Sequence, residues 1–348
     1  MRPVYFVMPD GIDDPLRPSG GNTYDRQLCR ELGPHGWTVH ERPVAGFWDR
    51  PDAASFAALE RALRQIPDDA VVLLDGLVAS TAPEVLVPQA GRLRLVVLVH
   101  MPLGHRPRDG AARGQEGAVL AGAAAAVTTS EWARRRLVEL YGLSADGVCV
   151  AEPGVEAAEP ARGSAAGEAL LCVGAVSFEK GHDILLEALA SISALSWRCT
   201  CVGSVGRDPA FVERLNRRWP GGRVSFPGPQ TGADLNRSYA SADLLVVASR
   251  AETYGLVVTE ALARGLPVIA AEVGGVAEAL GDGAAGSRPG LLVAPEDPAA
   301  LAEALGAWLG DAGLRDRLRR AAAERRESLP RWSATAAVVA GVLAEASP

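Results

Sequence analysis

Short aliphatic runs alternate with longer segments of helical periodicity along the whole chain, and this alternation constrains the fold most strongly. Parallel sheets covered by helices on both faces give such a pattern, because their strands are buried on two sides and their helices bury one apolar stripe. The expected strands are Val4–Met8, Thr38–His40, Val71–Leu74, Leu95–Val99, Ala126–Thr128, Val148–Val150, Ala169–Val173, Arg198–Val202, Val224–Phe226, Leu244–Ala248, Val268–Ala270 and Leu291–Val293. The expected helices are Asn22–Leu32, Ala53–Gln65, Gly110–Gly122, Glu131–Tyr141, Asp183–Ala194, Pro209–Trp219, Ala233–Ala240, Gly255–Arg264, Pro298–Leu309, Leu314–Glu327 and Trp332–Ala346.

The alternation pauses once, over a stretch of small, polar, Pro- and Gly-containing residues at Ala157–Glu168. Such a segment without apolar periodicity is typical of a linker. The chain length of 348 residues also predicts two domains at roughly 150 residues each. We therefore expect a first doubly wound α/β domain over residues 1–160 and a second over residues 168–328. A final helix, in residues 329–348, would pack back on the first domain. Ligands of such folds bind at the carboxyl ends of the strands, so we expect the two domains to face each other across a cleft.

Composition excludes several other classes of protein. A hydrophobic content of 48% with 22% charged residues is typical of a globular chain, and a net charge of −7 argues against a dedicated nucleic-acid binder. The apolar run Val4–Met8 is too short for a secretory signal, and no apolar run reaches the roughly 20 residues that span a bilayer. The five cysteines lack CxxC spacing and mostly lie in apolar runs, which favours a reducing compartment. We therefore expect a cytoplasmic protein without a transmembrane segment.

Two glutamates mark the most informative stretch, Ser249–Ala270. Glu252 is expected in a strand-to-helix loop, and the helix starting near Gly255 would offer free amides and a positive dipole end to a phosphate. A lone glutamate is most often a solvated surface residue. Glu260, however, lies within an apolar helical run, where a carboxylate needs a partner. The E-x7-E spacing, with serine upstream and G-x-P-V-I downstream, is therefore a specific composite pattern.

This stretch resembles the retaining family-four glycosyltransferases of GT-B architecture, whose donor half carries S-x-x-E-x-[FY]-G-x-x-x-x-E-A-x-x-x-G-x-P-V. The match runs from Ser249 to Val268. Further similar motifs occur in the family's order, and the resemblance covers nearly the whole chain. They are Ser19–Gly21, Val99-His100, Ser130, Pro153–Val155, Val173–Gly181, Gly274-Gly275 with Glu278, and Gly290–Val293.

The resemblance implies a set of site residues. Those implied for binding the donor are Gly20, Gly21, Gly174, Lys180, Glu252, Thr253, Tyr254, Gly255, Leu256 and Glu260, and those implied for catalysis are Lys180, Glu252 and His100. Lys180 would neutralise the leaving phosphate, Glu252 would hold hydroxyls of the donor sugar, Glu260 would bind the ribose, and His100 would orient substrate. Three of these assignments have a plainer alternative. Lys180 could be a solubilising lysine, His100 a core or capping histidine, and Gly20-Gly21 a flexible turn. The first alternative is weakened because Lys180 is the only lysine among 35 basic residues.

One position departs from the family pattern. Ala175 stands where the family usually has an arginine that contacts the diphosphate. The loss of one charge-assisted pair is worth about 1.5–3 kcal/mol, so another group should compensate or the donor should bind more weakly. Arg207, Arg250 and the amides near Gly20 are the candidates.

The resemblance implies an enzyme that moves a hexose-type sugar from a UDP- or GDP-linked donor to a hydroxyl of a small-molecule or lipid-linked acceptor, with retention of configuration. Neither a cofactor nor a metal is expected, since the chain has no D-x-D motif and no zinc-ligand spacing. Arg134–Arg136 is more typical of a solvated helix face than of a membrane contact. A nucleotide-sugar epimerase or hydrolase on the same scaffold, or a non-catalytic nucleotide-sugar binding protein, remains as an alternative.

Overall fold

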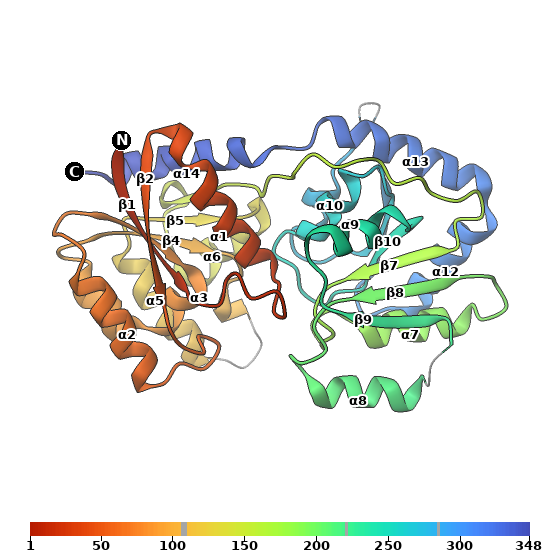
Figure 1. Ribbon diagram of the computed structural model, residues 1–348, viewed down its shortest axis with the longest axis horizontal. Helices are drawn as coiled ribbons and strands as arrows, with labels where there is room; N and C mark the ends of the chain where they lie inside the picture. The colour runs from red at the N-terminus through yellow and green to blue at the C-terminus, as the bar shows by residue number, and fades with distance from the viewer. Residues whose placement is uncertain (106–109, 220–221, 284–285) are drawn as a thin grey trace. The chain divides into compact units, whose positions relative to one another are not determined.

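The computed structural model describes residues 1–105, 110–219, 222–283 and 286–348, and it contains two six-stranded sheets with flanking helices (Figure 1). The chain divides into two compact units. Unit 1 comprises Met1–Asp13, Gly21–Gly154 and Pro330–Pro348, and unit 2 comprises Asp14–Gly20 and Val155–Leu329. The C-terminal segment therefore belongs to the same unit as the first strand.

The sheet of unit 1 is parallel, with the strand order β2-β1-β3-β4-β5-β6. Its strands are β1 (Arg2–Pro9), β2 (Trp37–Val44), β3 (Val71–Asp75), β4 (Arg94–Val99), β5 (Ala125–Thr128) and β6 (Val148–Val150). The direction in which strands are added reverses between β1 and β3. In open α/β sheets such a switch point opens a crevice at the carboxyl ends of the strands, where ligands bind.

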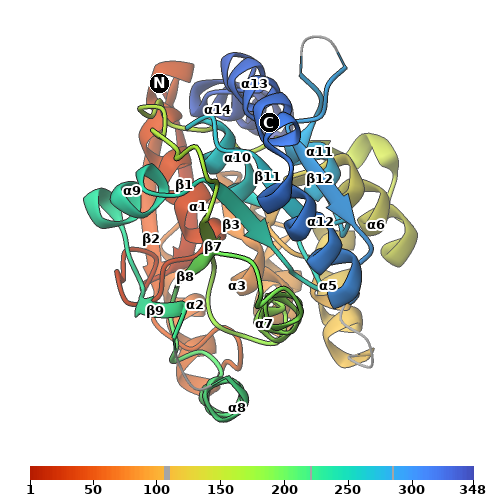
Figure 2. The same cartoon turned by 90° about the vertical axis from the view of Figure 1, so that its right-hand side faces the viewer.

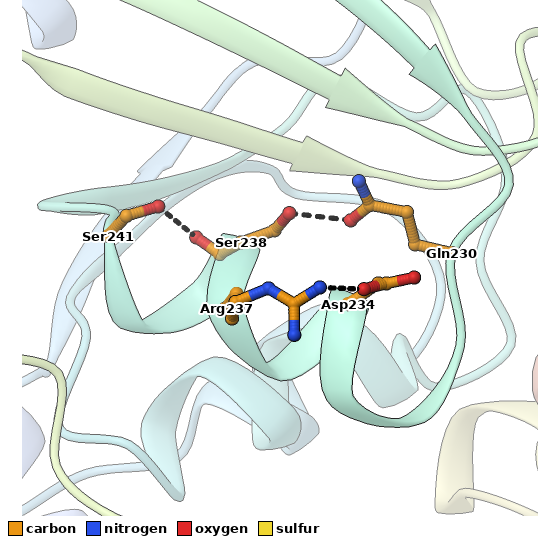
Figure 3. A pocket seen from close by; sticks show the side chains of 5 residues that line it. All are labelled: Gln230, Asp234, Arg237, Ser238 and Ser241. Carbon is orange, nitrogen blue, oxygen red and sulfur yellow. Dashed lines mark hydrogen bonds and ion pairs between the residues drawn. The ribbon is translucent and has the colours of Figure 1, made fainter.

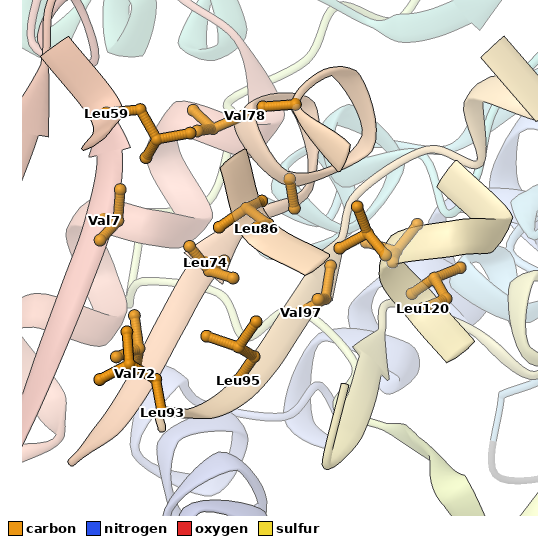
Figure 4. Packing of buried hydrophobic residues seen from close by; sticks show 14 of the residues in the cluster. Val7, Leu59, Val72, Leu74, Val78, Leu86, Leu93, Leu95, Val97 and Leu120 are labelled. Carbon is orange, nitrogen blue, oxygen red and sulfur yellow. The ribbon is translucent and has the colours of Figure 1, made fainter. Parts of the chain in front are cut away.

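Helices cover both faces of this sheet, and one face packs Val7, Val72, Leu74 and Val97 into a dry core (Figure 4). The helices are α1 (Gly20–Glu31), α2 (Ala53–Arg64), α3 (Gly76–Thr81), α4 (Pro83–Leu86), α5 (Gly110–Gly122), α6 (Glu131–Tyr141) and α14 (Trp332–Ala346). Side-chain caps start several of them, because the first amides of a helix lack partners within it. Asp75, the last residue of β3, caps α3 by accepting from the amides of Leu77 and Val78.

The final helix, α14, is held to unit 1 by polar and aromatic contacts. The Thr335 hydroxyl donates to the carbonyl oxygen of Glu152 at 2.7 Å, and the Trp332 ring meets the edge of Tyr24 with ring centroids 5.4 Å apart. Gly154 permits the close approach, since a Cβ built there would lie 2.2 Å from the backbone nitrogen of Trp332.

Unit 2 contains a parallel sheet with the order β12-β11-β10-β7-β8-β9, which is the strand order of a Rossmann fold. Figure 1 labels β10, and Figure 2 labels its other strands. Its strands are β7 (Ala169–Val173), β8 (Arg198–Val202), β9 (Val224–Gly228), β10 (Leu244–Val247), β11 (Val268–Ala271) and β12 (Gly290–Val293). Its helices are α7 (His182–Ser191), α8 (Pro209–Arg218), α9 (Gly232–Ala240), α10 (Leu256–Leu262), α11 (Val276–Leu280), α12 (Pro298–Gly310) and α13 (Ala312–Glu327). The switch point lies between β7 and β10.

Alternate residues of these strands enter two separate cores. Leu171, Leu245 and Val247 pack toward α10, α11 and α13, whereas Leu170 and Leu244 pack toward α7 and α12. Both faces of the sheet are therefore buried, which explains the continuous aliphatic runs in the sequence.

The stretch predicted to be a linker, Ala157–Glu168, contains no helix or strand, but it is held against unit 2. The Ser164 hydroxyl donates to the Asp243 carboxylate at 2.8 Å, and the Trp308 indole donates to the carbonyl oxygen of Gly167 at 2.7 Å. The chain passes from unit 1 to unit 2 between Gly154 and Val155, before this stretch. The Pro- and Gly-containing composition thus correctly indicates backbone without helix or strand. Hydrogen bonds nevertheless hold this backbone in place.

All twelve predicted strands are present, β6, β7 and β8 with the predicted bounds. The short helices α3, α4 and α11 were not predicted, because four to six residues are too few to establish a helical period. Helix α10 is shorter than predicted and begins at Leu256. Cys172, Cys199 and Cys201 are buried free thiols, as expected for core positions. Among the described residues, no helix is long and apolar enough to cross a membrane.

Gly154→Ala should destabilise the protein by about 1–3 kcal/mol, because the new methyl group must displace the start of α14. Urea denaturation followed by circular dichroism measures this change. Gly147→Ala is the matched control, since its Cβ would meet nothing within 4 Å. Equal stability of the two variants would contradict the close packing of α14 on Gly154.

Candidate functional site

The loops that follow β7 and β10 bring Lys180 and Glu252 together at the switch point of unit 2. The Lys180 ammonium lies 2.5 Å from Oε1 of Glu252, and the Ser249 hydroxyl donates to the same oxygen at 2.8 Å. The Lys180 side chain is 32% exposed and that of Glu252 is 10% exposed. A mostly buried carboxylate is therefore neutralised by a cation that still reaches solvent, which leaves a polar cluster open to a ligand on one side.

Glycines shape the backbone around this pair. Gly174 has φ +155°, a conformation that L side chains rarely adopt, and it lies beside the Lys180 stem, whose carbons would be in ordinary contact with a Cβ there at 3.5 Å. Gly274 has φ +56°, and a Cβ there would lie 1.6 Å from the carbonyl oxygen of Glu252. Gly275 then donates its amide to that oxygen at 3.2 Å. The Gly274-Gly275 pair thus packs its backbone closely against the Glu252 loop and holds the Glu252 carbonyl by a hydrogen bond.

The second glutamate, Glu260, has the partner that its apolar surroundings require. The Tyr239 hydroxyl on α9 donates to its Oε2 at 2.7 Å. Burial raises the pKa of Glu260, while the Tyr239 hydrogen bond and the charge of Arg264 act in the opposite direction. The Arg264 guanidinium also lies over the Tyr239 ring, 4.4 Å from its centroid. Tyr239 was not predicted as a site residue, because a tyrosine in a helix 21 positions upstream carries no local signal.

The remaining residues predicted around the donor lie in the same loop. Thr253 and Tyr254 are buried, and Gly255, with φ +94°, is the residue before the first turn of α10. Leu256 is the first residue of that helix. The loop thus presents its backbone at the switch point, beside Glu252.

Arg250, one candidate for the cation that is missing at Ala175, already pairs with other side chains. Its guanidinium makes two hydrogen bonds of 2.8 Å to the Asp183 carboxylate and lies over the Phe178 ring, 3.8 Å from the centroid. This arrangement supports the Lys180 loop from its far side, and it was not anticipated. Arg207 is exposed on the loop after β8.

In unit 1, the carboxyl ends of β3 and β4 and the first turns of α1 bring three titratable side chains together. His100 Nε2 lies 2.7 Å from Oδ1 of Asp25 and 3.7 Å from Oδ2 of Asp75. The His100 ring covers Gly21, where a Cβ would lie 3.1 Å from its Cδ2. Gly21 therefore makes room for the imidazole, a reason for this glycine beyond the predicted approach of a diphosphate. Asp25 and Asp75 were missed because neither belongs to a recognisable motif.

Burial strongly affects the protonation of this cluster. Burial and the neighbouring charge of Asp25 raise the pKa of Asp75 to about 7, although His100 acts in the opposite direction. Burial alone would lower the pKa of His100, but the charge and hydrogen bond of Asp25 raise it above its ordinary value. Asp75 and His100 therefore both have raised pKa values beside the Asp25 carboxylate.

A second group of chemically reactive side chains lies in the core of unit 2. Ligand atoms of Cys172, His182 and Cys201 lie within 4.8 Å of one another, and all three residues are buried. Thiols and an imidazole suit a soft cation. They also fill the face of the sheet toward α7, where Cys172 and Cys201 belong to the apolar core. The expectation that no metal takes part stays a prediction.

A surface hollow at α9 is lined by Gln230, Asp234, Arg237, Ser238 and Ser241, none of which was predicted as a site residue (Figure 3). Its polar side chains pair with one another: Arg237 with Asp234, and the Ser238 hydroxyl with Gln230 Oε1. Because these groups already satisfy each other, we assign no ligand to this hollow.

Comparison with solved structures defines the class of fold. A sucrose-phosphate synthase from Thermosynechococcus elongatus superimposes with a TM-score of 0.79 at 23% identity, covering 97% of this chain and 96% of that chain. HepE from Anabaena, in complex with UDP and glucose, gives 0.77 at 18% identity, covering 99% of this chain and 100% of that chain. The chain has the fold of the GT-B glycosyltransferases.

Sequence comparison then gives the family. Residues 167–311 match the family model described as Glycosyl transferases group 1, so unit 2 carries a group 1 glycosyl transferase domain. A D-inositol 3-phosphate glycosyltransferase of Nocardia farcinica is 39% identical over an alignment 206 residues long, which covers 53% of this chain and 44% of that protein. Another, of Salinispora tropica, is 34% identical over an alignment 289 residues long, which covers 75% of this chain and 59% of that protein. The matched region therefore spans about half the length of these relatives.

Gly274→Ala should lower stability by clearly more than the 1–3 kcal/mol typical of one strained backbone position, because the methyl group would also clash with the Glu252 carbonyl. Gly265→Ala is the control, since Gly265 has a similar φ of +68° but open space around its Cβ. Differential scanning calorimetry of both variants separates the clash from the strain. Equal melting temperatures would show that Gly274 does not hold the Glu252 loop.

Proposed function

We propose that the protein is a glycosyltransferase that moves a hexose-type sugar from a nucleoside diphosphate sugar to a hydroxyl group of an acceptor. The observation that carries this proposal is the Lys180–Glu252 pair, with Ser249, at the switch point of a group 1 glycosyl transferase domain. A cation reaching solvent beside a buried acceptor group suits a ligand that carries both phosphates and hydroxyls.

Each donor residue has a role that follows from its contacts. Lys180 would exchange part of its pairing with Glu252 for the phosphate oxygens and stabilise the charge that develops on them. Glu252 would accept from hydroxyls of the sugar, and Glu260, oriented by Tyr239, would accept from the ribose. The first amides of α10, after Gly255, would add donors to the diphosphate.

The chemistry that we propose retains the configuration of the sugar and requires no metal. The bond between the anomeric carbon and the diphosphate oxygen breaks with both electrons going to that oxygen. The acceptor oxygen bonds to the carbon on the same face, and its proton passes to the leaving phosphate. No side chain is then required as a base, so the protein acts by placing charge where the diphosphate leaves.

The substrates are assigned by analogy. The fold neighbour in complex with UDP favours a uridine donor over a guanosine donor. The relatives named for inositol 3-phosphate favour a small polyol acceptor over a lipid-linked one.

A thermal-shift screen with UDP, GDP and ADP sugars tests the donor, because a ligand at 100 times its Kd stabilises by about 2.7 kcal/mol. Product analysis with donor alone then tests the alternatives. Sugar release or isomerisation without acceptor would indicate a hydrolase or an epimerase. Binding without turnover across acceptors would indicate a binding protein.

Lys180→Ala should reduce kcat by two or more orders of magnitude, the scale seen when a group that stabilises transition-state charge is removed. Steady-state kinetics with saturating donor measures the effect. Arg217→Ala removes an exposed cation of the same unit and should leave kcat unchanged. Near-normal turnover of the Lys180 variant would remove this residue from the mechanism.

Tyr239→Phe should weaken nucleotide binding about tenfold or more, because Glu260 loses the hydroxyl that orients it and a hydrogen bond to a charged group is worth about 1.5–3 kcal/mol. Isothermal titration calorimetry measures the Kd. Tyr141→Phe is the matched control, since Tyr141 donates to buried Glu116 in unit 1. Unchanged affinity in the Tyr239 variant would contradict the ribose role of Glu260.

A further inference from the structure

At the switch point of unit 1, two buried carboxyl groups lie close to one imidazole. Burying ionised groups so close together costs free energy of folding. Asp25 and Asp75 are nearly inaccessible to solvent, whereas the His100 side chain keeps 18% of its surface exposed. Among the described residues, Asp25 Oδ2 is buried without a hydrogen-bond partner. Two neighbouring carboxylates cannot both ionise cheaply in a poorly solvated site, so protons must compensate for their charge.

The hydrogen-bond network decides how the imidazole is oriented. Nε2 lies 2.7 Å from Oδ1 of Asp25, a distance at which a protonated Nε2 donates to the carboxylate. Within the described part of the chain, the other ring nitrogen, Nδ1, has no hydrogen-bond partner. The ring is fixed by Gly21 beneath it and by the edge of Tyr24, with ring centroids 5.2 Å apart. His100 is thus oriented by its surroundings and keeps one nitrogen for a ligand.

We propose that Asp25 and Asp75 are positioning residues that hold His100 as an imidazolium, so that its Nδ1–H donates to an oxygen atom of the bound substrate. Asp25 supplies the opposite charge at hydrogen-bond distance. Asp75 holds the additional proton, while its Oδ1 remains fixed by the first amides of α3. This inference rests on the proposed function and assigns two residues to it that no motif indicated.

The competing role for His100 is that of a general base, and the geometry argues against it. A base needs a neutral imidazole with a free lone pair on Nδ1. Here the Asp25 carboxylate at 2.7 Å favours the protonated ring, and Asp75 at 3.7 Å favours it as well once that group ionises. The other titratable group packed on the ring is Tyr24, whose pKa burial keeps well above its usual range, so Tyr24 stays neutral.

The direction of the pH dependence follows from the two raised pKa values. An imidazolium with a raised pKa persists below that value and is lost as the pH rises through it. Asp75, with a pKa of about 7, is neutral below that pH and adds a negative charge above it. Both changes weaken binding of an electron-rich oxygen at higher pH. The charges of Asp75 and His100 affect each other's titration, so kcat/KM should fall as the pH rises through their raised pKa values.

The decisive measurement is the protonation of His100 in the whole protein, followed by ¹H–¹⁵N correlation of the imidazole nitrogens between pH 5 and 9. The signal is assigned by its absence in His100→Gln. In the wild-type protein we expect both ring nitrogens protonated at pH 7. In Asp25→Asn the midpoint should fall by about one pH unit or more, and the decline of kcat/KM should move by the same amount. Asp75→Asn should also lower the midpoint, while the asparagine still caps α3.

Asp52→Asn is the control, because it removes one carboxylate of unit 1 at the cap of α2 and touches neither His100 nor its partners. It should leave the His100 midpoint and the pH profile unchanged. A neutral His100 in the wild-type protein at pH 7, or an unchanged midpoint in Asp25→Asn, would overturn the proposal. A loss of kcat/KM that is equal at every pH would overturn it as well, since a purely structural role gives that result.

The nitrogen spectra need no substrate, so this proposal and the proposed function fail separately. If His100 titrates as expected but no donor supports transfer, the transferase assignment is wrong and the proton-holding cluster remains.

Discussion

The short contact between the Lys180 ammonium and the Glu252 carboxylate is the interaction on which the proposed donor site of unit 2 depends. The two residues are 72 positions apart and meet because β7 and β10 are neighbours at the point where the sheet changes direction. The carboxylate is mostly buried, so the cation is needed to stabilise it there. Gly274 leaves room for the Glu252 loop, since a Cβ there would lie 1.6 Å from the carbonyl oxygen of Glu252. The charged pair therefore forms only when the sheet of unit 2 has folded and brought these two loops together.

The two sheets share this design but use it for different chemistry. Unit 2 places a cation and a carboxylate at its switch point, whereas unit 1 places two carboxylates and an imidazole. In unit 2 both members lie in the loops after β7 and β10, whereas in unit 1 Asp75 ends β3, His100 follows β4 and Asp25 lies on α1. In unit 1 the ring of His100 lies over Gly21, whose missing side chain leaves room for the imidazole.

How much the sequence predicts depends on whether a residue's role is local. The buried strands were correctly placed because uninterrupted aliphatic runs mark them, and Glu260 was correctly predicted to have a partner because of its apolar neighbours. The identity of that partner, Tyr239, depends on how α9 packs on α10, which no local pattern encodes. Asp25 and Asp75 were missed for the same reason, since an acid at a strand end or within a helix is ordinary until a second acid lies beside it. The stretch before β7 was interpreted as a linker at the domain boundary, whereas the chain changes unit between Gly154 and Val155 and the stretch is hydrogen-bonded within unit 2, which composition does not encode.

Lys180 is the only lysine in this sequence, and about a third of its side chain is accessible. Amine-selective reagents therefore have one side-chain target, which lies in the proposed donor site, and the α-amino group is the other primary amine in this sequence. Covalent labelling, which in most proteins scatters over many surface lysines, becomes a site-directed probe in this chain without any engineering.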